Sequence, residues 1–272
     1  MPRNLLLCSL AGLLASALGV RAQPADLPLA PATTATYPPG VRVIRTAEGA
    51  VYASSRGKIL YGMDMRTVLR AGPDPSKACD AACAGTWEPL AAPAGSTPDI
   101  RFPMNNNEGR QASPPGSPKV SGQPDVPDWT IIAGAQGPQW VYKGWHMVFT
   151  RRGADARSTA FDGTDNRTWN TLKFVPPVPR IVAPQNVKTA FRGGQYVLVD
   201  ADGRTLFTGN CRNRRCDDWA PFAAGMASGG LGEWAVRSDG DTAQWTYRGR
   251  PVFVSLDDDR LHVPDSGTPL RP

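Results

Sequence analysis

Histidine is nearly absent from this sequence, with 2 residues in a chain of 272. His146 and His262 are the only imidazoles that a catalytic triad could use, and the chain has no G-x-S-x-G or H-E-x-x-H motif. Neither histidine has the second histidine of a standard zinc pair nearby. We therefore expect a protein that is not an enzyme and that needs no cofactor.

After residue 22 the chain has no apolar run that approaches the roughly 20 residues of a transmembrane helix. Residues 1–22 have the pattern of a signal peptide, because Arg3 precedes an apolar run over residues 5–20 and a cleavage site follows Ala22. Cys8 makes this segment lipoprotein-like, but Leu7 stands where a lipobox needs Gly or Ala. We expect a periplasmic or secreted protein with no transmembrane segment after signal cleavage.

A dense stripe of Lys and Arg is also lacking. The formal charge is +6, and removal of Arg3 and Arg21 with the signal peptide lowers it to +4. Such a mild surplus is not the electrostatic footprint of a nucleic-acid-binding protein. We expect no nucleic-acid partner.

Turn-forming residues are abundant, with 27 Pro and 28 Gly. This excess excludes an all-helical bundle and favours short strands joined by turns. Many of the prolines lie in an N-terminal arm at 23–41, a segment at 91–127 and a linker at 175–184. The segment at 91–127 is predicted to be a long surface excursion without secondary structure.

Three sequence signatures occur twice in the same order, which indicates an internal duplication. The first signature is Gly57-Lys58-Ile59-Leu60-Tyr61, repeated 146 residues later as Gly203-Arg204-Thr205-Leu206-Phe207. The second is Cys79, Trp87 and Pro89, repeated 132 residues later as Cys211, Trp219 and Pro221. The third is Trp129 with Gln139-Trp140-Val141-Tyr142-Lys143-Gly144, repeated 105 residues later as Trp234 with Gln244-Trp245-Thr246-Tyr247-Arg248-Gly249.

These copies define a first module at 42–174, which includes the Pro-rich insertion at 91–127, and a second module at 185–272. In the second, residues 195–200 and 204–207 are predicted to pair as a hairpin, because Asp202-Gly203 supplies a tight turn. Residues 50–54 and 58–61 are its counterpart. The predicted fold class is all-β: two tandem antiparallel β modules from an internal duplication, each with a disulfide-stapled loop.

A further strand is predicted after each Gln-Trp hairpin. We match Trp145-His146-Met147-Val148-Phe149 in the first copy with Arg250-Pro251-Val252-Phe253-Val254 in the second. This match aligns Trp145, the first residue after Gly144, with Arg250, the first residue after Gly249.

These segments together resemble a known family, the bacterial secreted repeats of unknown function, also described as predicted lipoproteins with a Yx(FWY)xxD motif. The features that carry the resemblance are Leu60-Tyr61, the Cys79 to Cys83 loop, Trp87-Glu88-Pro89-Leu90 and the Gln-Trp-x-Tyr-x-Gly hairpin. The motif that names the family is partial at Tyr61-Gly62-Met63-Asp64, where Met63 replaces the aromatic residue. The resemblance implies this fold and export, and it implies no activity.

Four cysteines remain in the mature chain, in two closely spaced pairs. Cys79 lies four residues before Cys83, and Cys211 lies five residues before Cys216. Cysteines this close bridge readily across one helical turn, so we predict two local structural disulfides. A bridge between the two copies and a redox or metal-binding dithiol are the alternatives.

Soft metal ligands gather in the first module, and an exported chain could use them for copper. The candidates are Met63, Met65, His146 and Met147. The alternative is that the methionines fill the core of the module, since Met63 and Met147 occupy aromatic or apolar positions of the repeat.

Aromatic residues alternate in the third signature, so Trp140 and Tyr142 share one sheet face, and so do Trp245 and Tyr247. If exposed, each pair would form a platform for a sugar, a peptide or a polymer. Their recurrence at equivalent positions favours a core role.

We therefore expect an exported, non-enzymatic repeat protein that binds an unknown ligand, or acts as a scaffold, at the cell envelope or outside the cell. The alternative is a periplasmic redox or copper-handling protein that uses Cys79 and Cys83 with the methionines and His146.

Overall fold

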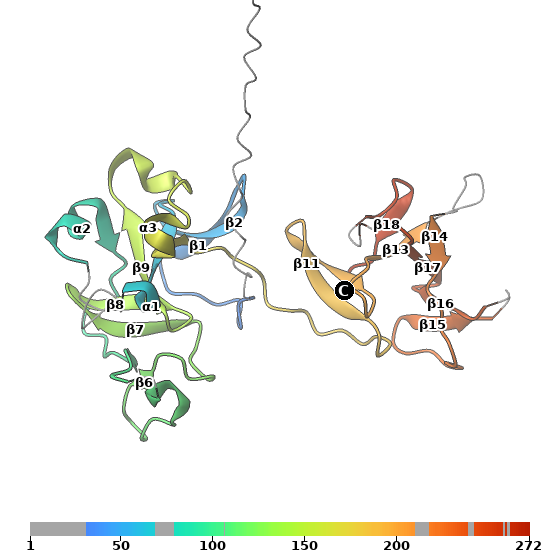
Figure 1. Cartoon of the computed structure of the whole chain (residues 1–272), viewed down its shortest axis with the longest axis horizontal. Helices are drawn as coiled ribbons and strands as arrows, with labels where there is room; N and C mark the ends of the chain where they lie inside the picture. The colour runs from blue at the N-terminus through green and yellow to red at the C-terminus, as the bar shows by residue number, and fades with distance from the viewer. Residues whose placement is uncertain are drawn as a thin grey trace, which may run out of the picture.

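The computed structural model describes residues 31–68, 79–105, 107–209, 218–238, 242–257, 259 and 262–272. The signal peptide and the predicted disulfide of Cys211 and Cys216 lie outside the described residues. The fold is all-β, with two similar six-stranded antiparallel sheets (Figure 1). No helix in the described ranges is long and apolar enough to cross a membrane.

The first module consists of a two-stranded hairpin and a six-stranded sheet. The hairpin pairs β1 (Val41–Thr46) with β2 (Gly49–Ser54). The sheet has the order β10-β3-β9-β8-β7, and β4 pairs with β9 outside that path. Its strands are β3 (Leu60–Asp64), β4 (Trp87–Pro89), β7 (Trp129–Gly134), β8 (Gly137–Tyr142), β9 (His146–Arg151) and β10 (Trp169–Thr171).

The second module repeats this architecture. Its hairpin pairs β11 (Lys188–Arg192) with β12 (Gln195–Val199). Its sheet has the order β18-β13-β17-β16-β15, and β14 pairs with β17. The strands are β13 (Leu206–Gly209), β14 (Trp219–Pro221), β15 (Trp234–Arg237), β16 (Gln244–Tyr247), β17 (Arg250–Ser255) and β18 (Gly267–Pro269). The predicted pair of tandem β modules is confirmed.

Helical structure is short throughout the described residues. The segments are α1 (Met65–Val68), α2 (Ala81–Thr86), α3 (Thr164–Arg167) and two 3-10 turns, η2 (Glu108–Arg110) and η3 (Gly153–Arg157). The helix α2 forms the Cys79 to Cys83 loop, where the sequence left room for a helical turn.

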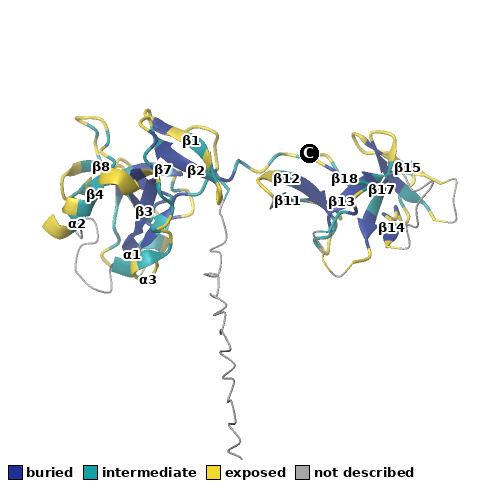
Figure 2. Cartoon of the chain, turned by 90° about the horizontal axis from the view of Figure 1, so that it is seen from above, coloured by how far each residue is buried: buried dark blue, intermediate teal, exposed yellow. Residues whose placement is uncertain are grey.

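Each module buries its own hydrophobic core, and the buried residues are dark blue in Figure 2. Tyr61 and Phe149 are fully buried in the first module, and Leu206 and Val252 in the second. The glutamine of the repeated hairpin has the same role twice: Gln139 Nε2 donates to the Val148 carbonyl and Gln244 Nε2 to the Val252 carbonyl, both at 2.8 Å. Gln139 is buried and Gln244 half-buried, and each amide thus satisfies a backbone carbonyl of the neighbouring strand.

The predicted hairpin at 195–207 needs a correction. Its turn is present, since Asp200 N donates to the Arg204 carbonyl, but β12 and β13 meet at one bridge, Val199 to Thr205. The full partner of β12 is β11. The strands separate because the N–H of Leu198 donates instead to the carbonyl of Leu270, next to β18.

The match between β9 and β17 is also corrected, by one residue. Pro89 pairs with Phe149 and Pro221 with Phe253, so Phe253 is the counterpart of Phe149. The loop before β9 contains Trp145, which has no equivalent after Gly249. This extra residue shifts the two strands relative to the sequence match.

The Pro-rich insertion is not structureless as predicted. It contains a short parallel pair, β5 (Ile100–Arg101) with β6 (Lys119–Val120). Ile100 and Val120 are buried, and Ile100 belongs to the core of the first module. The sequence signal was weak because these strands have two residues each, too few to show alternation.

Candidate functional site: an aromatic pocket in each module

The predicted disulfide between Cys79 and Cys83 is present, with 5.0 Å between the Cα atoms. Asp80 caps the helix that joins them, because its carboxylate accepts a hydrogen bond from the Cys83 N–H at 2.9 Å. Cys79 is buried and Cys83 packs against the same core. The bridge therefore fastens α2 next to Trp87, where β4 begins.

The candidate copper ligands are divided between two faces of the sheet. Met63 pairs with Met147 across β3 and β9, and both side chains lie in the core, as does Met65. His146 pairs with Asp64 on the opposite face, since neighbouring residues of a strand point in opposite directions. Within the described residues, no three His, Cys, Asp or Glu side chains gather as a metal site.

His146 lies instead beside an ion pair in which the Asp64 carboxylate is buried and the Arg66 side chain is half exposed. Its Nε2 is 3.9 Å from Asp64 Oδ2, and Arg66 donates to both oxygens of Asp64, at 2.9 and 2.7 Å. Burial lowers the pKa of His146 below its ordinary value, although the Asp64 carboxylate opposes this shift. Burial raises the pKa of Asp64, but the hydrogen bonds from Arg66 oppose this effect. They hold the pKa of Asp64 below its ordinary value.

This arrangement predicts a pH dependence of stability. A histidine whose pKa is lowered by folding binds fewer protons in the folded state, so stability falls as the pH decreases through about 6.5. The free energy of unfolding should decrease between about pH 8 and pH 5, and less so in His146→Gln. Urea unfolding at a series of pH values measures both, and equal slopes in the two proteins would contradict the expectation. Asp64 contributes its own loss only at lower pH, near the ordinary carboxylate range.

The four repeated aromatic residues differ in exposure. Tyr142, Trp245 and Tyr247 are buried, at 6, 7 and 7% exposure, as a core role requires. Trp140 is half-buried. It lies beside Trp129, with ring centroids 6.4 Å apart and planes at 86°. The first module therefore keeps one edge of its aromatic cluster accessible.

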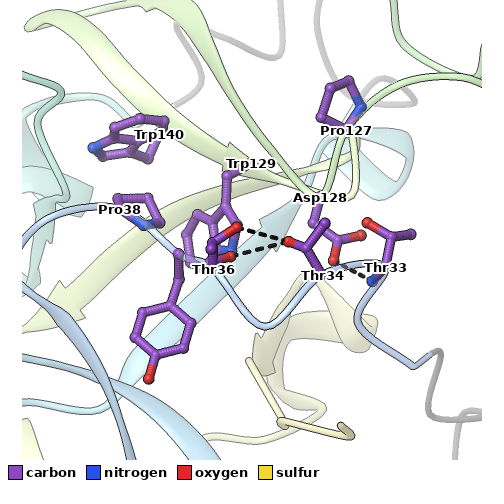
Figure 3. Close-up of a pocket in the computed structure, with 9 residues that line it drawn as sticks. Thr33, Thr34, Thr36, Pro38, Pro127, Asp128, Trp129 and Trp140 are labelled. Carbon is purple, nitrogen blue, oxygen red and sulfur yellow. Dashed lines mark hydrogen bonds between the residues drawn. The ribbon is translucent and has the colours of Figure 1, made fainter. Parts of the chain in front are cut away.

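A pocket of about 310 Å³ opens at this edge (Figure 3). Its walls combine the strands β7 and β8 with the last part of the Pro-rich arm. The lining residues are Thr33, Thr34, Thr36, Tyr37, Pro38, Pro127, Asp128, Trp129 and Trp140. The pocket thus has the rings of Trp129, Trp140 and Pro38 on one side and three threonines on another, and the hydroxyl groups of Thr34 and Thr36 hydrogen-bond to each other at 2.9 Å.

A buried ion pair fastens the arm along this pocket. Asp128 Oδ1 accepts from Lys143 Nζ at 2.9 Å, and Asp128 Oδ2 accepts from the Thr33 N–H at 2.6 Å. Lys143 Nζ also donates to the carbonyl of Pro31 at 2.7 Å. The carboxylate charge is therefore balanced within the protein, and the groups left to face a ligand are uncharged.

The second module has a pocket of about 300 Å³ at the equivalent place. Glu233, Trp234 and Tyr247 line it, each 105 residues after Asp128, Trp129 and Tyr142. The ion pair also recurs, because Arg248 Nη2 lies 2.8 Å from Glu233 Oε2. Here Val182 and its neighbours take the place of the arm, and Trp234 is only 2% exposed. The second pocket therefore adds aliphatic side chains to its aromatic wall, and its tryptophan is more deeply buried than Trp129 and Trp140.

Both pockets depend on the same local backbone. Lys143 and Arg248 adopt left-handed φ values of 48° and 51°, each followed by a glycine with positive φ. In the second module these two residues are the whole turn between Tyr247 and Arg250, as in a two-residue hairpin, and in the first module Trp145 lengthens the loop between Tyr142 and His146 to three residues. The turn aims each cation back at the acidic residue that precedes the β7 or β15 tryptophan.

The sequence analysis missed these acid–cation pairs and the arm. The signal was available, because Asp128 and Lys143 recur as Glu233 and Arg248 at the offset of the third signature. A fourth repeat was also overlooked: Val41 N donates to the Pro38 carbonyl and Val187 N to the Pro184 carbonyl, at the offset of the first signature. The ends of the arm and of the linker are thus parts of the repeated unit.

Fold and pockets together define an all-β protein of two similar modules, in each of which a segment that precedes the module lines a pocket beside a tryptophan. No family model, no curated protein and no solved structure matches the chain.

Proposed function

We propose that the chain is an exported, non-enzymatic binding protein of the cell envelope or the extracellular space, and that the pocket at Trp129 and Trp140 binds an uncharged saccharide. The observation that carries this proposal is the composition of the pocket wall. Two half-buried tryptophan rings stand at right angles opposite the threonine hydroxyl groups. Sites for small ligands combine apolar walls with a few placed polar groups in the same way.

A neutral ligand fits better than an ion, because the one carboxylate in the wall already has its cation. Asp128 is 6% exposed and accepts hydrogen bonds from Lys143 and Thr33. A charged ligand would lose its hydration in the pocket and gain no protein group of opposite charge in return. A saccharide offers apolar ring faces for the tryptophans and hydroxyl groups for Thr34 and Thr36, which hydrogen-bond to each other and keep lone pairs that can accept further hydrogen bonds.

Export is supported by the disulfide together with the signal-peptide pattern. Local disulfides persist in oxidising compartments and are rare in the cytosol. The bridge of Cys79 and Cys83 is formed in the structure. Cell fractionation combined with alkylation of the unfolded, unreduced protein tests the proposal. Recovery of the chain in the cytoplasm with reactive thiols at both positions would contradict export.

The saccharide site is tested by titrating the protein with a neutral oligosaccharide, N-acetylglucosamine tetramer, while tryptophan fluorescence is recorded. We expect saturable binding that weakens about tenfold in Trp140→Leu, because one aromatic wall is lost. Trp145→Leu is the matched control, since Trp145 lies outside the pocket. Thr34→Val should weaken binding as well, through loss of one hydroxyl group.

Two results would contradict the saccharide proposal. One is equal affinity of the unaltered protein and Trp140→Leu. The other is binding of a proline-rich peptide but of no neutral oligosaccharide, since aromatic grooves also accept the polyproline conformation.

The redox and copper alternative gains no support from the geometry. The thioethers of Met63 and Met147 face the core, and His146 faces Asp64 on the other side of the sheet. We therefore do not propose copper handling.

A further inference from the structure

The two modules differ at the open edge of one edge strand of the sheet, which is β7 in the first module and β15 in the second. In the first module, the edge of β7 is covered by the Pro-rich insertion. Asp99 N donates to the Ile131 carbonyl at 2.9 Å, and Asp99 Oδ1 accepts from the Ile131 N–H at 2.6 Å. The next residue, Ile100, is 1% exposed and packs into the core. A short extended segment thus satisfies both outward backbone groups of Ile131 and fills a core position.

The second module has the same edge without the insertion. Val236 follows Ile131 by 105 residues, and it pairs with Trp245 as Ile131 pairs with Trp140. Its N–H and carbonyl therefore point outward, as those of Trp234 do when they bond to Leu231. In the described ranges of the second module, no segment bonds to Val236 as Asp99 bonds to Ile131.

The place beside the hairpin glycine that Ile100 occupies is not filled by any described residue of the second module. A Cβ atom added to Gly144 would meet Val126 at 3.1 Å and Ile100 at 3.5 Å. A Cβ atom added to the equivalent Gly249 would meet no atom of the described residues within 4 Å. Among the described residues, the outward N–H and carbonyl of Val236 thus have no partner segment, and there is room for an apolar side chain beside Gly249. Edge strands of this kind are templates for pairing with another chain.

We propose that the edge of β15 binds an extended segment of a partner protein by β-strand addition, and that this segment carries an aspartate followed by a branched apolar residue. The first module supplies the template, because Pro98-Asp99-Ile100 occupies the equivalent edge. A second copy of this chain is a poorer source, since its own segment is held in its first module by the buried Ile100. Main-chain hydrogen bonds would provide affinity, and the aspartate and the apolar side chain would provide specificity.

The test uses a peptide with the sequence of residues 96–103, Ser-Thr-Pro-Asp-Ile-Arg-Phe-Pro, added to the full chain labelled for NMR. We expect saturable shifts of the Val236 amide and its neighbours at peptide concentrations up to about 5 mM, and no shift at Ile131, whose edge is occupied. A peptide with Asp99→Ala should bind about tenfold more weakly, because it lacks the charge-assisted acceptor for the Val236 N–H. A peptide N-methylated at the aspartate should bind no better than the Asp99→Ala peptide, because it cannot donate a hydrogen bond to the Val236 carbonyl.

The matched protein variant is Val236→Pro, which removes the outward N–H at an edge position where proline is tolerated. It should keep the unfolding profile of the unaltered protein and lose binding of the peptide. The proposal is overturned if the peptide causes no saturable shift at β15, if Val236→Pro binds it equally well, or if the three peptides bind alike. It is also overturned if the edge is blocked by self-association, seen as a concentration-dependent increase in mass by sedimentation. The pocket at Trp140 is not involved, so either result leaves the saccharide proposal standing.

Discussion

Replacement of Trp87 by alanine should cost about 3–5 kcal/mol of the free energy of unfolding of the first module. Trp87 is 5% exposed and stacks on Trp169, with ring centroids 4.0 Å apart and planes at 10°. The ring also meets Tyr61 in an edge-to-face arrangement, with centroids 5.1 Å apart, and the guanidinium of Arg151 lies 5.1 Å from its centroid. Removal of the ring leaves a large cavity between β4 and β10, and a loss of this size is a major part of the stability of a small domain.

Urea unfolding followed by circular dichroism and tryptophan fluorescence measures this effect. Because the hydrophobic clusters of the two modules share no residue, we expect two transitions, of which Trp87→Ala shifts one. Trp219→Ala is the matched variant, since Trp219 is 8% exposed and meets Phe207 at 4.9 Å in the second module. It should shift the other transition. A single transition that moves equally in both variants would show that the modules unfold as one unit.

Replacement of Asp128 by alanine should cost about 3 kcal/mol, because it leaves the ammonium group of Lys143 without its partner in a largely buried place. The side chains of Asp128 and Lys143 are 7 and 22% exposed. The same change at the equivalent Glu233 should have little effect, since the side chains of Glu233 and Arg248 are 53 and 59% exposed and water solvates both charges.

The pair Asp128→Ala and Glu233→Ala is informative because it removes the same interaction from two settings of one fold. Chemical denaturation gives the stability of each, and NMR shifts of the Thr33 amide report whether the arm has left the pocket. A loss that is equal at the two positions would mean that burial does not decide the strength of this ion pair. An unchanged Thr33 signal in Asp128→Ala would mean that the arm is held by other contacts.

The sequence predicted the architecture well where local patterns were strong. The repeated Gln-Trp-x-Tyr-x-Gly segment identified β8 and β16 and the turns that follow them. Cys79 and Cys83 were predicted to bridge from their spacing alone, and they do. The predicted partner of β12 was wrong, because the true partner β11 shows little alternation and has no buried residue. Strand pairing is decided by contacts over the whole module, which no short window contains.

The pocket could not be predicted from the sequence in the same way. It forms because residues 33–38 cross strands that lie about a hundred residues further along the chain, as in the bond from Thr33 to Asp128. Burial of Trp245 compared with Trp140 depends on such distant packing as well. The sequence did allow the two copies to be compared. Residues that are the same in both copies indicate a shared structural role, and residues that differ indicate where the two pockets differ.

The Asp99 to Ile131 contact has a consequence for how the chain folds. Tandem copies of one β module present each other with nearly identical strand edges, so a strand of one copy can pair with the wrong copy and trap a misfolded chain. The first module prevents this error at β7, because its own insertion pairs with the edge of β7 and a strand of the second module cannot bind there. A deletion of residues 97–102 should therefore reduce the yield of refolded monomer more than its effect on stability accounts for. An insertion that interrupts the repeat in the sequence thus keeps the two copies distinct during folding.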